Sequence, residues 1–289
     1  DSQRLAVSLR SSIAKRRSHL NAALGIQWNN GVTVKVKLYK YVPFSDGAKA
    51  IIRDGTLKFS SRLEFNDPFD CIARFNKKKT LNELSKREPI LRGIMKNRNL
   101  SVEERFRAKK IAANEMSKLI ESNYFDSMAD QLGICCLSKV YDNILMWSHY
   151  ADKHQGIVIE FSTEQLHEKN SHNSEYSLLG FDVDYSPTMP EVGNVLVNDF
   201  ERDVKPLIFT KAIDWKYEEE FRVVSNNRGV GIHKFDQNLI TRVFTGVNFS
   251  QDNLDELECL VRNLREKTNN TIPIVPLKKS DSQYSLVHA

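Results

Sequence analysis

Three consecutive acidic residues, followed closely by an arginine, have the residue types most suited to catalysis in this sequence: Glu218, Glu219, Glu220 and Arg222. Two carboxylates that face the same side repel each other, which raises the pKa of one of them. A neighbouring guanidinium keeps the other carboxylate ionised and holds its orientation. A fixed, ionised carboxylate beside an aromatic cleft is suited to stabilising a sugar cation as that cation forms.

The segment that carries these acids is predicted to be a strand over residues 215–225. Because strand side chains alternate between two faces, Glu218, Glu220 and Arg222 share one face, and the aromatic residues share the other. Glu219 then falls on the aromatic face, which requires a bulge or an exposed edge. An alternative stays open, in which the charged face is a solvent-facing ladder of Lys, Glu and Arg side chains.

A second group of aromatic and polar residues lies on a predicted helix over residues 143–152. Met146, Trp147 and Tyr150 share one face of this helix, and His149 points away from it. Met146 and Trp147 are expected in the core, whereas the polar ends of Tyr150 and His149 need a partner. No histidine has the spacing of a metal site or of a nucleophile–base pair, so no metal centre is predicted.

The remaining candidates lie in the first quarter of the chain. Tyr39, Lys40 and Tyr41 are strand residues by pattern, and Asn66-Asp67-Pro68 is an ordinary turn signal. Asp67 and Asp70 are expected to cap nearby backbone groups. A different interpretation, a metal-dependent hydrolase that uses Asp67 and Asp70, also stays open.

The elements that must position these residues indicate the α+β class, with mixed or mainly antiparallel sheets. Ser45 is expected to cap a helix over Asp46–Asp54 that ends at Gly55. An apolar stripe predicts a helix over 251–267. Further strands are expected over residues 31–41, 56–60, 132–138, 156–161 and 181–185, and an antiparallel meander over 215–225, 229–235 and 240–244.

Composition limits the class of protein. Hydrophobic residues make up 40% and charged residues 27% of 289, which is typical of a globular chain. No apolar run approaches the roughly 20 residues of a membrane span, so no membrane partner is expected. The four cysteines form no metal or disulfide framework, which favours reduced thiols in a cytoplasmic protein. We expect a basic helical segment over residues 1–30 and one α+β domain over 31–289, with a helical insertion at about 77–130.

Positive charge is concentrated in this predicted insertion. Residues 77–110 contain twelve basic and four acidic residues, although the whole chain has a net charge of only +5. Such a patch attracts a phosphate backbone. A non-catalytic nucleic-acid-binding module is therefore an alternative function, and a plain solvated helix surface is the simplest explanation of the same pattern.

Five short motifs occur in order along the chain: Tyr39-Lys-Tyr41, Phe59-Ser-Ser61, Phe65-Asn-Asp-Pro-Phe-Asp70, Met146-Trp-Ser-His-Tyr-Ala-x-x-His154-x-Gly156 and Trp215-x-Tyr-Glu-x-Glu-x-Arg222. Together they resemble a bacterial family known as domain of unknown function 2971. The resemblance runs from about residue 38 to the C-terminus. The family has no firm activity.

A looser resemblance is to ADP-ribosyltransferases. Gly55-x-Leu-x-Phe-Ser60, the strand Gly133–Ser138 followed by Tyr150, and Glu218-x-Glu220 are similar to their motifs. It implies an ADP-ribosyltransferase-like split sheet with a helical insertion, in an enzyme of the toxin or phage-defence type. The substrate would be NAD, and ADP-ribose would pass to a macromolecular acceptor, either protein or nucleic acid.

The same resemblance implies a role for each candidate residue. Glu220 binds the ribose of the nicotinamide half and stabilises the oxocarbenium ion, Glu218 orients the acceptor, and Tyr150 stacks on nicotinamide. Lys40 stands where these enzymes usually have His or Arg. The other positions that the resemblance places around NAD are Tyr39, Lys40, Tyr41, Ser60, Ser61, Asn66, Asp67, Ser138, Trp147, His149 and Arg222.

Overall fold

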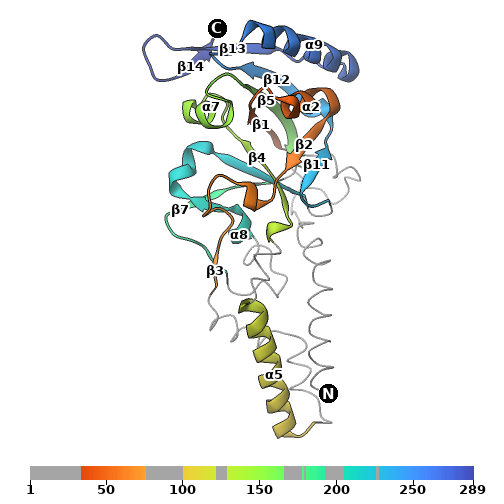
Figure 1. Cartoon of the computed structure of the whole chain (residues 1–289), viewed down its shortest axis with the longest axis vertical. Helices are drawn as coiled ribbons and strands as arrows, with labels where there is room; N and C mark the ends of the chain where they lie inside the picture. The colour runs from red at the N-terminus through yellow and green to blue at the C-terminus, as the bar shows by residue number, and fades with distance from the viewer. Residues whose placement is uncertain are drawn as a thin grey trace. The chain divides into compact units, whose positions relative to one another are not determined.

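The computed structural model describes residues 34–75, 100–121, 129–165, 178, 180–192, 205–225 and 228–289 (Figure 1). Both helices and strands occur along these residues, and the eight-stranded sheet is mainly antiparallel, so the predicted α+β class is confirmed. The basic segment 1–30 and the most basic part of the expected insertion lie outside the described residues.

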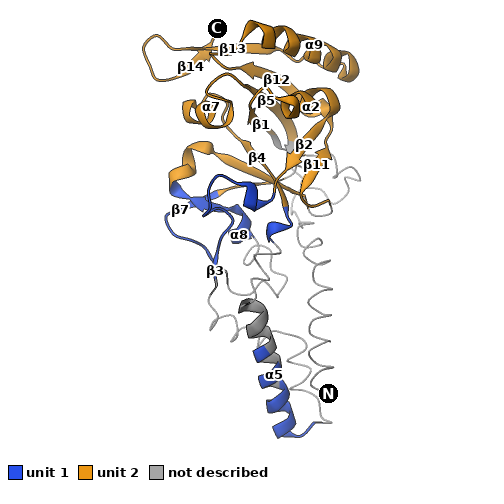
Figure 2. Cartoon of the chain, in the orientation of Figure 1, with its two compact units in different colours: residues 1–26, 61–132, 184–213 blue, residues 27–60, 133–183, 214–289 orange. Residues whose placement is uncertain are grey.

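The chain divides into two compact units, coloured separately in Figure 2, and each is described by itself. The first comprises residues 1–26, 61–132 and 184–213. The second comprises residues 27–60, 133–183 and 214–289 and contains the large sheet. The described elements of the first unit are the 3-10 helix Arg62–Glu64, β3 (Arg74–Phe75), α5 (Val102–Glu121), β7 (Asp184–Ser186), β8 (Glu191–Val192), α8 (Lys205–Phe209) and β9 (Thr210–Ala212).

The large sheet has the strand order β14-β13-β12-β5-β1-β4-β10-β6. All neighbouring pairs are antiparallel except β12 and β13, which are parallel. A separate pair joins β2 and β11. The strands of this unit are β1 (Val34–Val42), β2 (Thr56–Phe59), β4 (Gly133–Ser138), β5 (Ile157–Gln165), β6 (Phe181–Asp182), β10 (Glu220–Ser225), β11 (Gly231–Lys234), β12 (Ile240–Thr245), β13 (Ile274–Lys279) and β14 (Leu286–His288).

The sheet branches between β1 and β4. These two strands pair at a single position, Tyr39 with Ser138. Towards its other end β4 bridges to Ser60 through Ile134, immediately after β2. In the gap between β1 and β4, the Lys40 ammonium donates a hydrogen bond to the Cys136 carbonyl, with 2.8 Å between Nζ and the oxygen. Strand β4 thus pairs with β1 at one end and approaches the end of β2 at the other.

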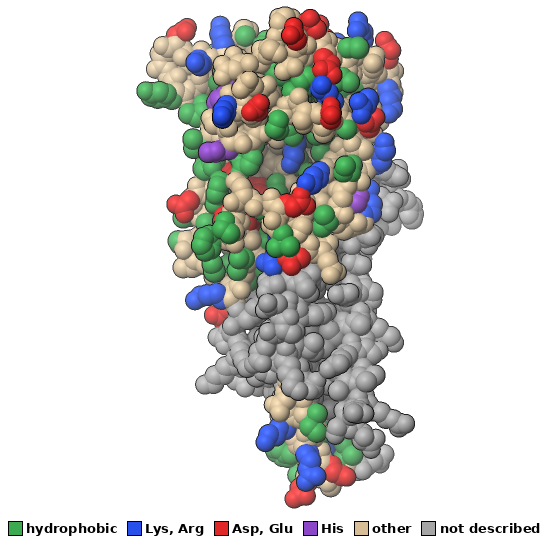
Figure 3. All heavy atoms as spheres, in the orientation of Figure 1, with side chains coloured by type: hydrophobic (Ala, Val, Ile, Leu, Met, Phe, Trp, Pro, Cys, Tyr) green, Lys and Arg blue, Asp and Glu red, His purple; other side chains and the backbone are tan. Residues whose placement is uncertain are grey.

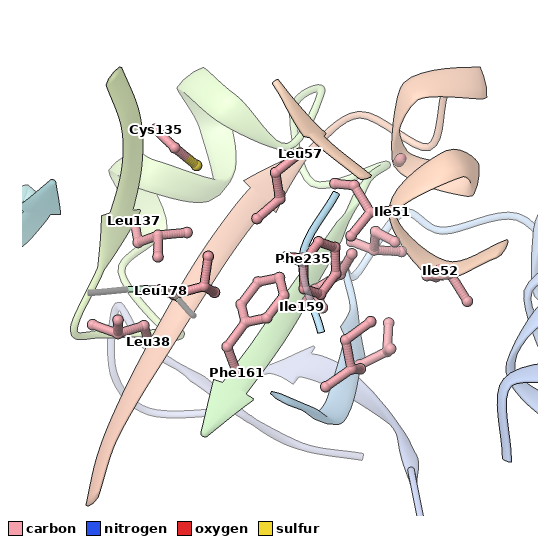
Figure 4. Close-up of a cluster of buried hydrophobic side chains, with 14 of the residues drawn as sticks. Leu38, Ile51, Ile52, Leu57, Cys135, Leu137, Ile159, Phe161, Leu178 and Phe235 are labelled. Atoms are coloured by element: carbon pink, nitrogen blue, oxygen red, sulfur yellow. The ribbon is translucent and has the colours of Figure 1, made fainter. Parts of the chain in front are cut away.

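Each face of the sheet has its own hydrophobic cluster. The larger cluster includes Leu38 and Phe161 and is covered by α2 (Asp46–Asp54) and α9 (Gln251–Thr268) (Figure 4). The second cluster contains Tyr39 and Tyr41 from β1 and the buried Trp147 from α7 (Ile144–Tyr150). Alternation along β1 therefore decides which of its side chains face which cluster.

Most locally encoded elements were predicted correctly. The helix Asp46–Asp54 and its left-handed stop at Gly55, with φ of 64°, are confirmed, although the Ser45 side chain makes no cap hydrogen bond. Helix α9 buries Leu257, Val261 and Leu264 of the predicted stripe. Strand β14 pairs with β13 at the edge of the sheet.

The predicted meander is wrong. Strand β10 pairs with β4 and β6, β11 pairs with β2, and β12 pairs with β5 and β13. The reason is burial: five of the six residues of β10 are buried, and a buried strand needs hydrogen-bonding neighbours on both edges. Neighbours in sequence cannot supply both edges here.

Two glycines provide a matched test of backbone packing. A Cβ at Gly156 would overlap the carbonyl oxygen of Val42, whereas a Cβ at Gly47, near the start of α2, would lie 3.7 Å from Ser45 Oγ. We predict that Gly156→Ala lowers the free energy of unfolding by about 1–3 kcal/mol. Gly47→Ala should raise it by about 0.5–1 kcal/mol, because alanine has the higher helix propensity. Urea unfolding of both variants measures this difference, and equal effects would contradict it.

Candidate functional site

Five polar residues lie side by side across five neighbouring strands of the second unit. The strand registers align Arg242 of β12 with Glu160 of β5, Tyr39 of β1, Ser138 of β4 and Glu220 of β10. Directly paired residues of antiparallel strands point to the same face. We call this set the polar row. At about 4.8 Å between strands it spans roughly 19 Å.

At one end of the polar row, Glu220 forms a buried ion pair with Arg222. The guanidinium donates from Nε to Oε1 over 2.7 Å and from Nη2 to Oε2 over 3.0 Å. Glu220 is 4% exposed and Arg222 is fully buried. Such a two-bond pair fixes the plane of the carboxylate and keeps it ionised despite its removal from water.

The other buried acid of this region, Glu218, meets Tyr150. The Tyr150 hydroxyl donates to Glu218 Oε1 over 2.6 Å, although the two residues are 68 positions apart. Glu218 is 3% exposed. This short, charge-assisted bond holds the tyrosine of α7 beside the start of β10. Tyr150 thus contacts the acidic segment through Glu218.

Ser138 positions this acidic segment through backbone contacts. Its hydroxyl donates to the Glu218 carbonyl over 2.7 Å and accepts from the Val140 amide over 3.1 Å. The Lys139 amide donates to the Glu219 carbonyl over 3.0 Å. In this structure the Ser138 hydroxyl is engaged with the chain itself, which makes it a positioning residue.

The strand predicted from residue 215 is wrong in its first half. Residues Ile213–Glu218 form a 3-10 helix, and β10 begins only at Glu220. The reason is the partner strand: Glu220 pairs with Ser138, the last residue of β4, so residues before Glu220 have no β4 residue to pair with. The solvent-facing ladder is also excluded, since Glu218, Glu220 and Arg222 are all buried.

Glu219 has a different place from its two neighbours. Its φ of 41° lies in the left-handed region, and its side chain is exposed. This backbone turn replaces the alternation of a strand and lets Glu218 and Glu220 both be buried. Glu219 is therefore not buried with Glu218 and Glu220.

The side chains of Tyr39, Lys40 and Tyr41 all form hydrogen bonds within the protein. The Tyr39 hydroxyl donates to Glu160 Oε2 over 3.2 Å, and burial followed by the Glu160 charge raises the pKa of Tyr39. The Tyr41 hydroxyl donates to the Val140 carbonyl over 2.9 Å, and burial raises the pKa of Tyr41. Both phenols therefore stay protonated in the neutral pH range, as hydrogen-bond donors.

Most residues of the motif from Met146 to Gly156 stabilise the fold. Trp147 is fully buried, as predicted, and its Nε1 donates to the Tyr141 carbonyl over 2.7 Å. The chain then reverses through three left-handed residues, Asp152, Lys153 and His154, which brings the His154 ring parallel to Trp147 with 6.1 Å between centroids. His149 is exposed, and its ring lies edge-on to that of Tyr150 with 6.3 Å between centroids.

The candidates around residue 60 fall in different units. Ser60 belongs to the sheet unit and pairs through its backbone with Ile134. Ser61 and Asp67 belong to the other unit, as does the exposed Asn66. Ser61 caps the following 3-10 helix, and Asp67 accepts from the Phe69 amide over 2.9 Å, which confirms the predicted capping role of Asp67.

Asp70 lies in a buried ion pair. It lies 3.6 Å from the Lys211 ammonium, measured to Oδ2, and both side chains are buried. Within the described ranges, no three His, Cys, Asp or Glu side chains are grouped so that they could hold a metal ion. A metal-dependent hydrolase built on Asp67 and Asp70 therefore gains no support from the geometry.

Two charged residues of the polar row were missed by the sequence analysis, namely Glu160 and Arg242. Glu160 is the one acid in the apolar run 156–161, and such a residue in a buried strand needs a partner. This was the available signal. Cys136 was also missed; burial, followed by the nearby Glu220 charge, raises the pKa of its thiol well above the usual value.

Part of the chain matches a known protein family. Residues 146–223 match the model of a family described as Protein of unknown function (DUF2971), and this part of the chain is similar to that family. The matched stretch contains Tyr150, Glu160, Glu218, Glu220 and Arg222, and it includes the last two of the predicted motifs. No curated protein and no solved structure matches the chain.

The remaining surface observations concern partners. None of the helices in the described part of the chain has the length and apolar character needed to cross a membrane. On the face in Figure 3, the coloured Lys and Arg side chains are intermixed with Asp and Glu. The predicted basic patch lies mainly outside the described residues.

The left-handed backbone at Glu219 generates a stability prediction. Glycine adopts this conformation without the steric cost that an L-residue bears, although glycine also raises the entropy of the unfolded chain. We predict that Glu219→Gly changes the free energy of unfolding by no more than about 1 kcal/mol, in the stabilising direction. Glu219→Val should destabilise the protein by about 1–2 kcal/mol. Urea unfolding measures whether Glu219→Gly is more stable than Glu219→Val. If the Glu219 backbone were fully extended, the valine variant would be the more stable of the two.

The pH dependence of stability follows from His154. Burial lowers the pKa of His154 below its usual 6.5, and its Nδ1 is buried without a hydrogen-bond partner in the described structure. A histidine whose folded pKa is depressed stabilises the fold above the unfolded pKa, and this contribution is lost as pH falls through the folded pKa. We expect the difference in unfolding free energy between the native protein and His154→Asn to shrink from pH 7.5 to pH 5. A constant difference would contradict this.

Proposed function

We propose that this protein is an ADP-ribosyltransferase-like enzyme that cleaves NAD at its nicotinamide bond and transfers ADP-ribose to a macromolecular acceptor, either a protein or a nucleic acid. The observation that carries the proposal is the convergence of Tyr150, Glu218 and the Glu220–Arg222 pair at the end of β4. Tyr150 and Glu218 come from two segments that lie 68 positions apart, and local folding alone does not demand that they meet.

The proposed reaction breaks the bond between C1′ of the ribose and the nicotinamide nitrogen. The bonding electrons leave with nicotinamide, whose positive charge they neutralise, and the ribose becomes an oxocarbenium ion. A carboxylate that is already ionised and oriented stabilises this cation without reorganising during the reaction. Glu220 has this property because Arg222 fixes both of its oxygens.

Glu218 is suited to the second half of the proposed reaction. An acceptor atom attacks C1′, forms the new bond and releases its proton. Glu218 would orient this acceptor, and its carboxylate already accepts a proton-bearing group, the Tyr150 hydroxyl. The same bond holds the Tyr150 ring in place, as a ring that stacks on nicotinamide would require.

The branching of the sheet also supports the proposal. An ADP-ribosyltransferase-like fold is expected to have a split sheet, and β1 and β4 pair at one position only. The Tyr39–Ser138 pair at this junction lies in the same register as Glu220. The candidate carboxylate is thus next to the point where the strands diverge.

Glu220→Gln, which keeps the shape of the side chain and removes its charge, tests the function. With labelled NAD and cell lysate, we expect nicotinamide release to fall by at least about 100-fold, the effect of losing one electrostatic stabiliser. Glu219→Gln, at the exposed neighbouring position, is the matched control and should retain activity. Label recovered in protein, in nucleic acid or as free ADP-ribose identifies the acceptor.

Folding must be controlled because Glu220→Gln leaves the buried Arg222 without its anion. Tyr150→Phe, at a half-buried position, removes only one hydroxyl and its bond to Glu218. It should slow transfer, and its thermal unfolding temperature should fall because the buried Glu218 loses a hydrogen-bond donor. Transfer is therefore compared at a temperature at which both proteins are folded. Nicotinamide release that is undetectable in the native protein, or unchanged in a folded Glu220→Gln variant, would refute the proposal.

A further inference from the structure

The end of the polar row opposite Glu220 contains a second charged centre. Glu160 is 2% exposed and lies between two cations. Its Oε1 is 3.5 Å from Lys37 Nζ, and its Oε2 is 4.0 Å from Arg242 Nη1. Nothing in the proposed transferase reaction uses these residues. One carboxylate thus faces two positive charges.

The hydrogen bonds of Glu160 come from neutral donors. The Tyr39 hydroxyl donates to Oε2 over 3.2 Å and the Thr241 hydroxyl donates to Oε1 over 2.8 Å. Both cations lie at or beyond the outer limit of hydrogen-bond distance from the carboxylate. Glu160 is therefore satisfied without consuming the donors of Lys37 and Arg242.

Arg242 has unused hydrogen-bonding capacity. Its guanidinium makes no hydrogen bond among the described residues, and its buried Nε has no partner there. A buried donor that makes no hydrogen bond destabilises the protein. A guanidinium offers several donors in a fixed fork, which matches the oxygens of a phosphate group. The cost is removed when an anion binds.

One aromatic ring lies beside this cation, and two more rings follow it. The Arg242 guanidinium lies 5.7 Å from the centroid of Phe244, and Tyr141 stacks on Phe244 with 4.4 Å between centroids and 12° between planes. The exposed His288 places Nε2 3.4 Å from the Tyr141 hydroxyl. Rings beside a cation provide a flat surface for an aromatic base.

We propose that Lys37 and Arg242 bind the phosphate group of a nucleoside monophosphate, whose base lies against Tyr141 and His288. Lys37 is suited to this because its side chain is 57% exposed and sits two residues from Tyr39 on the same strand. The buried Glu160 holds the two cations near each other and weakens anion binding by repulsion. The site stands on these contacts and does not depend on the proposed transferase activity.

The test is a calorimetric titration of the full-length protein with AMP, alongside adenosine and inorganic phosphate. We expect AMP to bind more tightly than either part, and Arg242→Gln to weaken AMP binding at least tenfold. Lys37→Gln should weaken it several-fold. Arg53→Gln is the matched control, since Arg53 is an exposed arginine already paired with Asp54, and should change nothing.

A second variant keeps the proposal testable if Arg242→Gln does not fold. Glu160→Gln removes the competing negative charge and should tighten AMP binding by several-fold. Were Arg242 only a structural partner of Glu160, this substitution would leave AMP binding unchanged or weaker, and the proposal would fail.

Three further results would overturn the proposal. One is no binding of AMP to the native protein at millimolar concentration. Another is loss of AMP binding in Glu220→Gln, which would place the nucleotide at the other end of the polar row. The third is an effect of Arg242→Gln on binding of a single-stranded oligonucleotide but not of AMP, which would assign the cations to nucleic acid.

Discussion

The single backbone pair between Tyr39 and Ser138 is the constraint on which the candidate site depends. It sets the register between β1 and β4, and hence between Glu160 on one side and Glu220 on the other. A slip of one residue would turn every polar side chain of one strand group into the opposite hydrophobic cluster. Ser138 reinforces this pair, because its hydroxyl also holds the backbone of Glu218.

Three buried carboxylates on one face would be costly if any stayed uncompensated. Each is compensated differently: Glu220 by the guanidinium of Arg222, Glu218 by a phenol, and Glu160 by two hydroxyls and two more distant cations. The two-bond pair with Arg222 fixes the charge of Glu220 in place, which suits electrostatic catalysis. The cations near Glu160 keep unused hydrogen-bond donors, which suits the binding of an anion.

The motif from Met146 to Gly156 separates folding from chemistry within eleven residues. Trp147, His154 and Gly156 serve the reversal of the chain after α7, through ring packing and a close backbone approach. Tyr150 alone reaches the buried acids. A motif that matches a family can therefore owe most of its residues to backbone geometry, and similarity over residues 146–223 does not by itself identify an activity.

The sequence by itself determined the α+β class, helices α2 and α9, the apolar strands β4 and β5, and the burial of Trp147. These features follow from capping, periodicity and apolar runs, which act over a few residues. Only the tertiary structure decided the strand order, the 3-10 helix before Glu220 and the partners of Glu160. Those depend on pairing between distant residues, such as Tyr39 with Glu160 across 121 positions, and no local pattern encodes which strand becomes the neighbour of another.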